Sequence, residues 1–134
     1  MRVLVDNNLS PKIALAIHAL VEQDGHEVVH LRKKFRPETD DATVLGRLAE
    51  EGRWAFLTLD MAIARKPHQR ALWSNQRITI FFLERSWQRK GMSLIEQAGR
   101  LLLRWKDIAL QFELVEPPAG FKVPLKGRLK QVRF

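Results

Sequence analysis

Short apolar segments, several of which end in an acid, alternate with helical segments along this chain. Four of these apolar segments are rich in Val, Ile, Leu or Phe, as buried strands are. The expected strands are Arg2–Val5, His26–Leu31, Trp54–Leu59 and Ile78–Leu83. Strands that alternate with helices form parallel sheets covered on both faces. The pattern therefore predicts a three-layer α/β fold with a small parallel sheet of about four strands.

Helix signals fill the segments between these strands. Ser10 is a good N-cap and Pro11 is tolerated at the first helical position, so a helix is expected from there to about Glu22. Its expected inward residues are Ile13, Leu15, Ala16, Leu20 and Val21. Further helices are expected from a cap at Thr39 or Asp40 to Glu51, irregularly from Met61 to Trp73, and from Ser93 to about Phe112. A basic loop, Arg32–Glu38, is expected before the second helix.

An assumed strand order of 2-1-3-4 places the first and third strands side by side, with the chain reversing direction between them. At such a reversal, a crevice opens beyond the carboxyl ends of the strands. Asp6 and Asp60 directly follow these two strands. The pattern therefore predicts that both carboxylates face one crevice. The length of 134 residues suits a single domain, 1–134.

The C-terminal segment, residues 117–134, has a composition of its own. It contains five Lys or Arg residues and no acid. From Phe121 to Phe134 it alternates loosely between apolar and basic residues, and Pro124 and Gly127 interrupt the pattern. The segment is expected to form either an edge strand or an extended basic arm.

Composition excludes several functions. The chain has no cysteine, which excludes disulfides, thiolate catalysis and Cys-based zinc sites. Its net charge of +8 favours RNA, DNA or an acidic protein as partner, although an inert basic surface is the alternative. The N-terminal apolar run is too short for a signal peptide, and no apolar run is long enough to span a bilayer. We therefore expect a cytoplasmic protein with no membrane partner.

Two carboxylates in one crevice repel each other unless a cation, a shared proton or a basic side chain offsets the charge. Hard divalent cations such as Mg²⁺ and Mn²⁺ prefer oxygen ligands, and they can activate water and neutralise a phosphodiester. Asp6 and Asp60 suit such an ion. They could equally be turn or cap residues. Asp41 could be a third ligand or a first-turn acid that complements its helix dipole, and Asp40 could take its place.

The sequence resembles a known family at two motifs. LVDNNLSPKIALAI resembles the opening of PIN-like domains, in which a strand runs into an Asp-x-Asn-Leu motif and then a helix. DDATVLGRLAEEGRWAFLTLD resembles their second motif, in which an acid at a helix start precedes a strand ending in Thr-x-Asp. The resemblance continues through IARKPHQRALWSNQRITIFFLE, the Trp-containing last helix and the basic C-terminal segment. This combination looks like the PIN-like group classed with VapC-type ribonuclease toxins.

The resemblance implies a Mg²⁺- or Mn²⁺-dependent nuclease that acts mostly on RNA. Carried over residue by residue, the implied catalytic residues and metal ligands are Asp6, Asp41 and Asp60, with Asn7, Asn8 and Thr58 as supporting polar residues. Two positions depart from the family pattern. Asn7 replaces a Glu of many relatives, and Ala62 replaces a second acid. The resemblance also implies a cognate antitoxin as protein partner and leaves a homodimer open.

Basic residues near the acids are candidates for RNA binding. Arg65, Lys66 and Arg70 follow Asp60 closely and could contact phosphates, which position a nucleic acid without reading its sequence. They could instead form a solvated helix start. Lys33, Lys34 and Arg36 precede Asp41 and are expected to form a second positive wall.

Two aromatic residues are further candidates for the site. His68 is the only histidine near the acids and could assist catalysis, whereas the others are expected to be structural. Trp87 lies among cations and could stack on a base, although a loop anchor is the favoured interpretation.

The leading hypothesis is a metal-dependent endoribonuclease that acts as the toxin of a type II toxin–antitoxin pair. The alternative is a PIN-like module that binds RNA or a protein without cleavage, and Asn7 and Ala62 motivate it.

Overall fold

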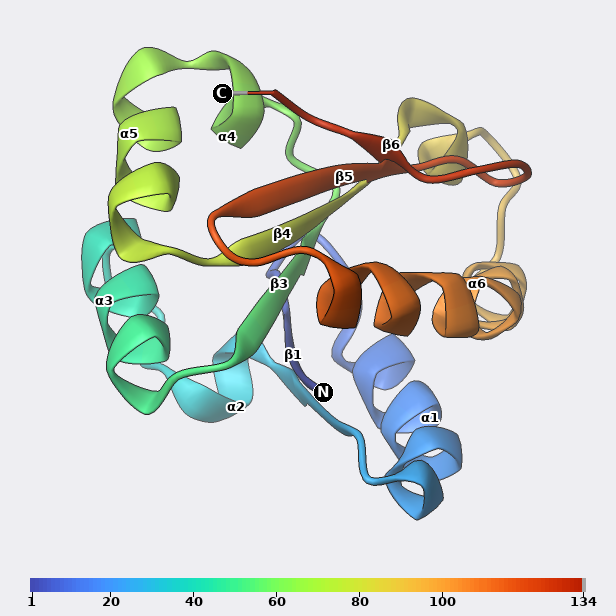
Figure 1. Cartoon of the computed structure of the whole chain (residues 1–134). Coiled ribbons are helices and arrows are strands. Elements are labelled where there is room, and N and C mark those ends of the chain that lie inside the picture. The colour runs from blue at the N-terminus through green and yellow to red at the C-terminus, as the bar shows by residue number, and fades with distance from the viewer. Residues whose placement is uncertain (134) are drawn as a thin grey trace.

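A six-stranded, mostly parallel sheet runs through the part of the chain that the computed structural model describes, residues 1–133 (Figure 1). The strands are β1 (Arg2–Val5), β2 (Glu27–His30), β3 (Trp54–Thr58), β4 (Thr79–Leu83), β5 (Ala119–Val123) and β6 (Lys130–Gln131). Their order is β2-β1-β3-β4-β5-β6, so the predicted 2-1-3-4 arrangement is confirmed. Only β5 and β6 pair antiparallel in these residues. The predicted limits of the first four strands never differ from the observed ones by more than one residue.

Helices cover both faces of the sheet (Figure 1). They are α1 (Pro11–Val21), α2 (Leu31–Lys34), α3 (Asp41–Glu51), α4 (Ala62–Arg65), α5 (Pro67–Gln76) and α6 (Leu94–Leu114), with 3₁₀ turns at Glu22–Asp24 and Arg85–Gln88. Helices α1 and α6 pack on one face, whereas α3, α4 and α5 pack on the other. The three-layer α/β prediction is therefore correct, with six strands in place of about four.

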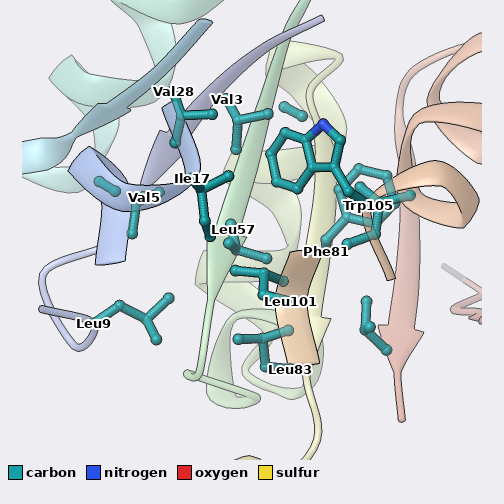
Figure 2. Close-up of a cluster of buried hydrophobic side chains, with 14 of the residues drawn as sticks. Val3, Val5, Leu9, Ile17, Val28, Leu57, Phe81, Leu83, Leu101 and Trp105 are labelled. Carbon is teal, nitrogen blue, oxygen red and sulfur yellow. The ribbon is translucent and has the colours of Figure 1, made fainter. Parts of the chain in front are cut away.

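The pleat of the strands divides the apolar residues between two cores. Val3 and Val5 contribute to the core under α1 and α6, and Leu4 points to the opposite core. In the first core, Ile17 of α1 and Trp105 of α6 lie over the sheet (Figure 2). Both faces of the central strands are buried, which explains why these strands read as continuous apolar runs.

The inward face of α1 differs from the predicted one. Leu15 and Leu20 are 59% and 54% exposed, and Ala16 is also exposed. The buried stripe is Ile13, Ala14, Ile17 and Val21. Ile13 and Val21 are buried as predicted. The other three predicted residues belong to the neighbouring, solvent-exposed face of the helix.

Two helical segments also depart from expectation. The predicted basic loop Arg32–Glu38 begins inside α2, where the side chain of His30 accepts a hydrogen bond from the Arg32 N–H at 3.1 Å. The irregular helix predicted from Met61 to Trp73 is two helices, α4 and α5, separated at Lys66, whose backbone is extended, and α5 continues to Gln76. Pro67 explains the interruption, because proline disfavours the helical conformation in the residue before it.

The C-terminal segment is not an arm. Strand β5 pairs with β4 in parallel and buries Ala119, Phe121 and Val123. The edge position predicted for the whole segment belongs only to the two-residue strand β6. Phe134 lies outside the described residues.

Gly120 in β5 touches the indole of Trp73 so closely that an added Cβ would collide with Cη2 and Cζ2 of that ring. Trp73 cannot retreat easily, because its Nε1 donates to the carbonyl oxygens of Ile78 at 2.6 Å and Ala119 at 3.1 Å.

We expect Gly120→Ala to lower the free energy of unfolding by about 1–3 kcal/mol or more, because overpacking strains a rigid core. Gly99→Ala is the matched control. Nothing lies within 4 Å of the added Cβ of Gly99 on α6, so this change should raise stability by at most about 1 kcal/mol. Urea denaturation of both variants measures the difference, and equal stabilities would contradict the packing.

Candidate metal centre

A cavity of about 400 Å³ opens beyond the carboxyl ends of β1 and β3, at the predicted reversal point of the sheet. Asp6 follows β1, Asp60 follows β3 by two residues, and Asp41 is the first residue of α3. All three side chains line this cavity. The fold thus brings together three acids that are far apart in the sequence.

Asp6 is held on both of its carboxylate oxygens. Its Oδ2 accepts hydrogen bonds from the Thr58 hydroxyl at 2.6 Å and from Asn8 Nδ2 at 3.1 Å. Its Oδ1 accepts from the Asn7 N–H at 2.6 Å. Asn8 also accepts from the Leu59 N–H at 3.1 Å, which ties the residues after β1 to the end of β3. The orientation of Asp6 is therefore fixed from two strands.

Asp60 is positioned by its own turn. Its N–H donates to the Thr58 hydroxyl oxygen at 2.9 Å, and its Oδ1 accepts from the Ala62 N–H at 2.9 Å. Thr58 is fully buried, and its hydroxyl group bonds both to the Asp6 carboxylate and to the Asp60 N–H. One hydroxyl group therefore connects Asp6 to Asp60.

The structure separates the roles of Asp40 and Asp41. Asp40 is the N-cap of α3, since its Oδ1 accepts from the Thr43 N–H at 2.7 Å. Hydrogen bonds from the Thr43 side chain and, to a smaller extent, from its N–H hold the pKa of Asp40 below its ordinary value. Asp41 is exposed and faces the cavity from the first helical turn. Because Asp40 caps the helix, the Asp41 carboxylate remains available to the cavity.

Burial raises the pKa of Asp6 above its ordinary value of 3.8, and the negative charges of Asp41 and Asp60 raise it further. The hydrogen bonds from Thr58 and Asn7 oppose this rise without cancelling it. The cavity therefore concentrates negative charge that a cation would neutralise.

The donor chemistry suits a hard divalent cation, because carboxylate and carboxamide oxygens are its preferred ligands. Asp6, Asp41 and Asp60 supply the carboxylates, and Asn8 lies beside them. Within residues 1–133, however, no three Asp, Glu, His or Cys side chains are close enough to form a ligand cluster. The acids thus surround the cavity at a spacing wider than that of a closed coordination shell.

A family model described as PIN like domain matches residues 1–85. The chain belongs to the PIN-like domain family. The matched part spans β1 to β4 and contains all three acids. No curated protein matches the sequence, and no solved structure does either.

The basic residues of this PIN-like domain are not equivalent. Arg65, Lys66 and Lys33 are exposed. Arg70 donates to the carbonyl oxygen of Ala64 at 2.9 Å and to that of Arg133, so it links Arg133 to α4.

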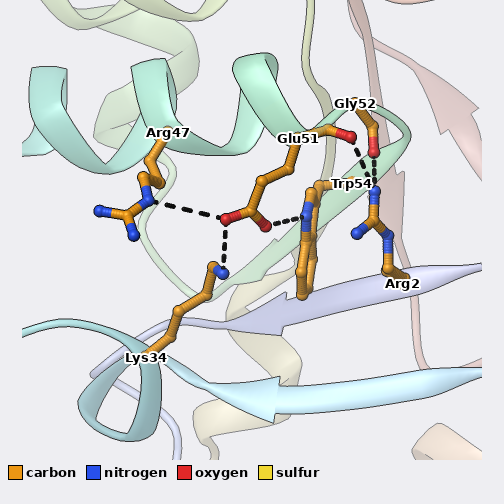
Figure 3. A network of polar contacts seen from close by, with 6 residues as sticks. All are labelled: Arg2, Lys34, Arg47, Glu51, Gly52 and Trp54. Atoms are coloured by element: carbon orange, nitrogen blue, oxygen red, sulfur yellow. Dashed lines mark hydrogen bonds and ion pairs between the residues drawn. The ribbon is translucent and has the colours of Figure 1, made fainter.

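Lys34 turns away from the acids. Its Nζ lies 2.8 Å from Glu51 Oε2 and 5.1 Å from the centroid of the Trp54 ring (Figure 3). Trp54 begins β3, whereas Asp60 lies beyond its other end. Lys34 therefore stabilises the amino-end side of the sheet. It does not contribute to a positive wall at the cavity.

His68 and Trp87 lie outside the cavity. His68 is exposed and is not among the cavity residues. Trp87 is 1% exposed and donates to the Val123 carbonyl at 2.8 Å, so it is a loop anchor and cannot stack on a base. In the described chain, no helix combines the length and apolarity needed to cross a membrane.

Sequence reasoning missed the apolar part of the cavity. Its apolar lining residues are Leu31, Val44, Leu45, Phe56, Ile63, Leu72 and Ile80. Gln69 of α5 also lines the cavity. The helical spacing of Gln69 and Leu72 places them on one face, but nothing in the sequence directs that face toward the acids.

We expect NMR titration of Asp6 to give a pKa above 3.8, because burial and two like charges disfavour ionisation. Asp41→Asn or Asp60→Asn should lower this pKa only part of the way, since burial is the largest cause and remains. Without metal, the contribution of Asp6 to stability is full below its unfolded pKa and is lost as pH rises through the raised folded pKa. A midpoint at or below 3.8 would contradict the site electrostatics.

Proposed function

We propose that this PIN-like domain is a Mg²⁺- or Mn²⁺-dependent endoribonuclease. Members of this family are often nucleases. The observation that carries the proposal is the convergence of Asp6, Asp41 and Asp60 on one cavity in a chain of net charge +8. Carboxylates supply the ligands of a hard cation, and the positive charge of the rest of the chain attracts a polyanion.

The residues would divide the work as follows. Asp6, Asp41 and Asp60 would hold the ion, which when bound supplies water activation and charge neutralisation at a phosphodiester. Thr58 and Asn8 keep the Asp6 carboxylate oriented through the hydrogen bonds described above. The exposed cations that follow Asp60 would bind the phosphates of the RNA strand.

We further propose that the protein acts in the cytoplasm as the toxin of a type II toxin–antitoxin pair, with an antitoxin protein as its partner. The resemblance of the two aspartate motifs and of the C-terminal half to VapC-type toxins supports this role. A small adjacent gene encoding an antitoxin-like protein would add support that is independent of the residues.

A second candidate function is a non-catalytic PIN-like module that binds RNA or a protein. Asn7 and Ala62 stand where many relatives carry acids, and the acids of residues 1–133 form no compact ligand cluster. This candidate predicts RNA affinity without cleavage and without a metal effect on stability.

Cleavage of RNA in Mn²⁺ tests the nuclease. We expect Asp41→Asn to reduce cleavage activity by more than roughly 10- to 100-fold, which is the loss typical of mutating a residue that only hydrogen-bonds to a metal ligand. Asp40→Asn is the matched control at the adjacent position, because Asn is an equally good N-cap and Asp40 does not line the cavity. Equal losses in the two variants, or activity that survives EDTA, would rule out the proposed site.

Thermal unfolding with metal separates the two candidate functions. If Mn²⁺ binds only the folded protein, a concentration of 100 times Kd should stabilise it by about 2.7 kcal/mol. Asp60→Asn should abolish the increase in melting temperature. The increase should also shrink on acidification, starting at a higher pH than for an ordinary carboxylate, because the pKa of Asp6 is raised. The absence of any metal effect would favour the binding module.

RNA binding at several salt concentrations tests the basic residues. Lys66→Gln should weaken binding and reduce the salt slope by about 0.7, because one phosphate contact to single-stranded RNA is lost. Lys34→Gln is the matched control, since Lys34 pairs with Glu51, and it should leave the slope unchanged. A larger effect from Lys34→Gln would contradict the assignment.

A further inference from the structure

The apolar part of the cavity is not explained by a metal ion. A hydrated cation needs oxygen ligands and water. Yet the cavity is also lined by Phe56 and Ile80 of the sheet, by Val44 and Leu45 of α3, and by Leu72 of α5. About 400 Å³ lies within the range of small-molecule sites, in which apolar walls carry a few placed polar groups.

Gln69 is the polar residue that lines this apolar part of the cavity. Its Oε1 is buried and has no hydrogen-bond partner among the described residues, although the side chain lines the cavity. A buried acceptor without a donor costs about 1–3 kcal/mol. A ligand that carries an N–H group into the cavity would remove this cost. The carboxamide also offers a donor beside its acceptor, which matches an edge with both kinds of group.

We propose that this cavity binds one nucleobase of the nucleic-acid strand, with the ring against the apolar residues and its edge hydrogen-bonded by Gln69. The inference rests on the proposed function for the identity of the strand. It adds that the protein selects the base next to a phosphate, which would approach a cation held by the acids. Gln69 is then a specificity-determining residue and not a catalytic one.

A nucleobase suits the cavity better than an apolar side chain of a protein partner. A base has apolar faces and an edge of N–H donors and acceptors, whereas an aliphatic or phenyl group would leave the Gln69 oxygen unpaired. The cavity is continuous with Asp6, Asp41 and Asp60, where a phosphate would approach a bound cation. The net charge of +8 also favours a polyanion.

Methyl NMR with single nucleosides in metal-free buffer provides the test, because it needs neither catalysis nor phosphate. The methyl groups of Ile63 and Ile80 line the cavity, whereas Ile13 and Ile17 lie in the core on the other face of the sheet. We expect one of the four ribonucleosides at millimolar concentration to shift the cavity methyls saturably. The methyls of Ile13 and Ile17 should not move.

Two variants make the result specific. Gln69→Met keeps the length of the side chain and removes its hydrogen-bonding groups. It should therefore weaken binding of the preferred nucleoside by about 5-fold or more. Leu72→Trp should fill the cavity and abolish binding, while unshifted methyls of Ile13 and Ile17 report an intact fold. Four nucleosides that bind equally, with no effect of Gln69→Met, would overturn the inference. So would indole shifting the cavity methyls when no nucleoside does.

Cleavage of oligonucleotides that differ at one position separates this inference from the proposed function. A base preference that Gln69→Met abolishes supports both. Nucleoside binding without any cleavage would sink the nuclease and keep the base site. Cleavage that shows no base preference, together with no nucleoside binding, would sink the base site alone.

Discussion

Parallel pairing of β1 with β3 is the constraint on which the rest of the site depends. It places Val5 opposite Leu57, and the ladder continues one step further through a bond from the Asp6 N–H to the Leu57 carbonyl at 2.9 Å. The buried Thr58 hydroxyl then lies within reach of both acids. Because the cores on both faces hold these two strands in register, the geometry of the carboxylates follows from the packing of the whole sheet.

Much of this arrangement could be predicted from the sequence. The short apolar runs gave four of the strands, and right-handed crossovers with an assumed order gave their neighbours and the crevice. The segment that contains β5 was expected to form an edge strand or an arm, because Pro124 and Gly127 interrupt its pattern and Gly120 weakens the strand itself. Its place in the sheet is decided by pairing with β4, which is a non-local interaction.

The rest of the site depends on side-chain directions that periodicity cannot supply. Lys34 and Lys33 are neighbours in the sequence, yet only one of them reaches Glu51 and Trp54, because the short helix α2 directs them differently. Likewise, the cavity is closed by apolar residues from several helices and two strands. No local pattern could show that these residues and Gln69 meet beside three aspartates.

The contact between Trp73 and Gly120 links the part of the chain that matches the family to the part that follows it. Trp73 lies within residues 1–85, but its ring packs against a glycine of β5 and donates to the carbonyl of Ala119. Helix α6 likewise completes the core beneath β1 and β3. The boundary of sequence similarity at residue 85 is therefore not a folding boundary. A chain cut at that point would give two fragments, each exposing apolar residues that the other covers in the intact domain.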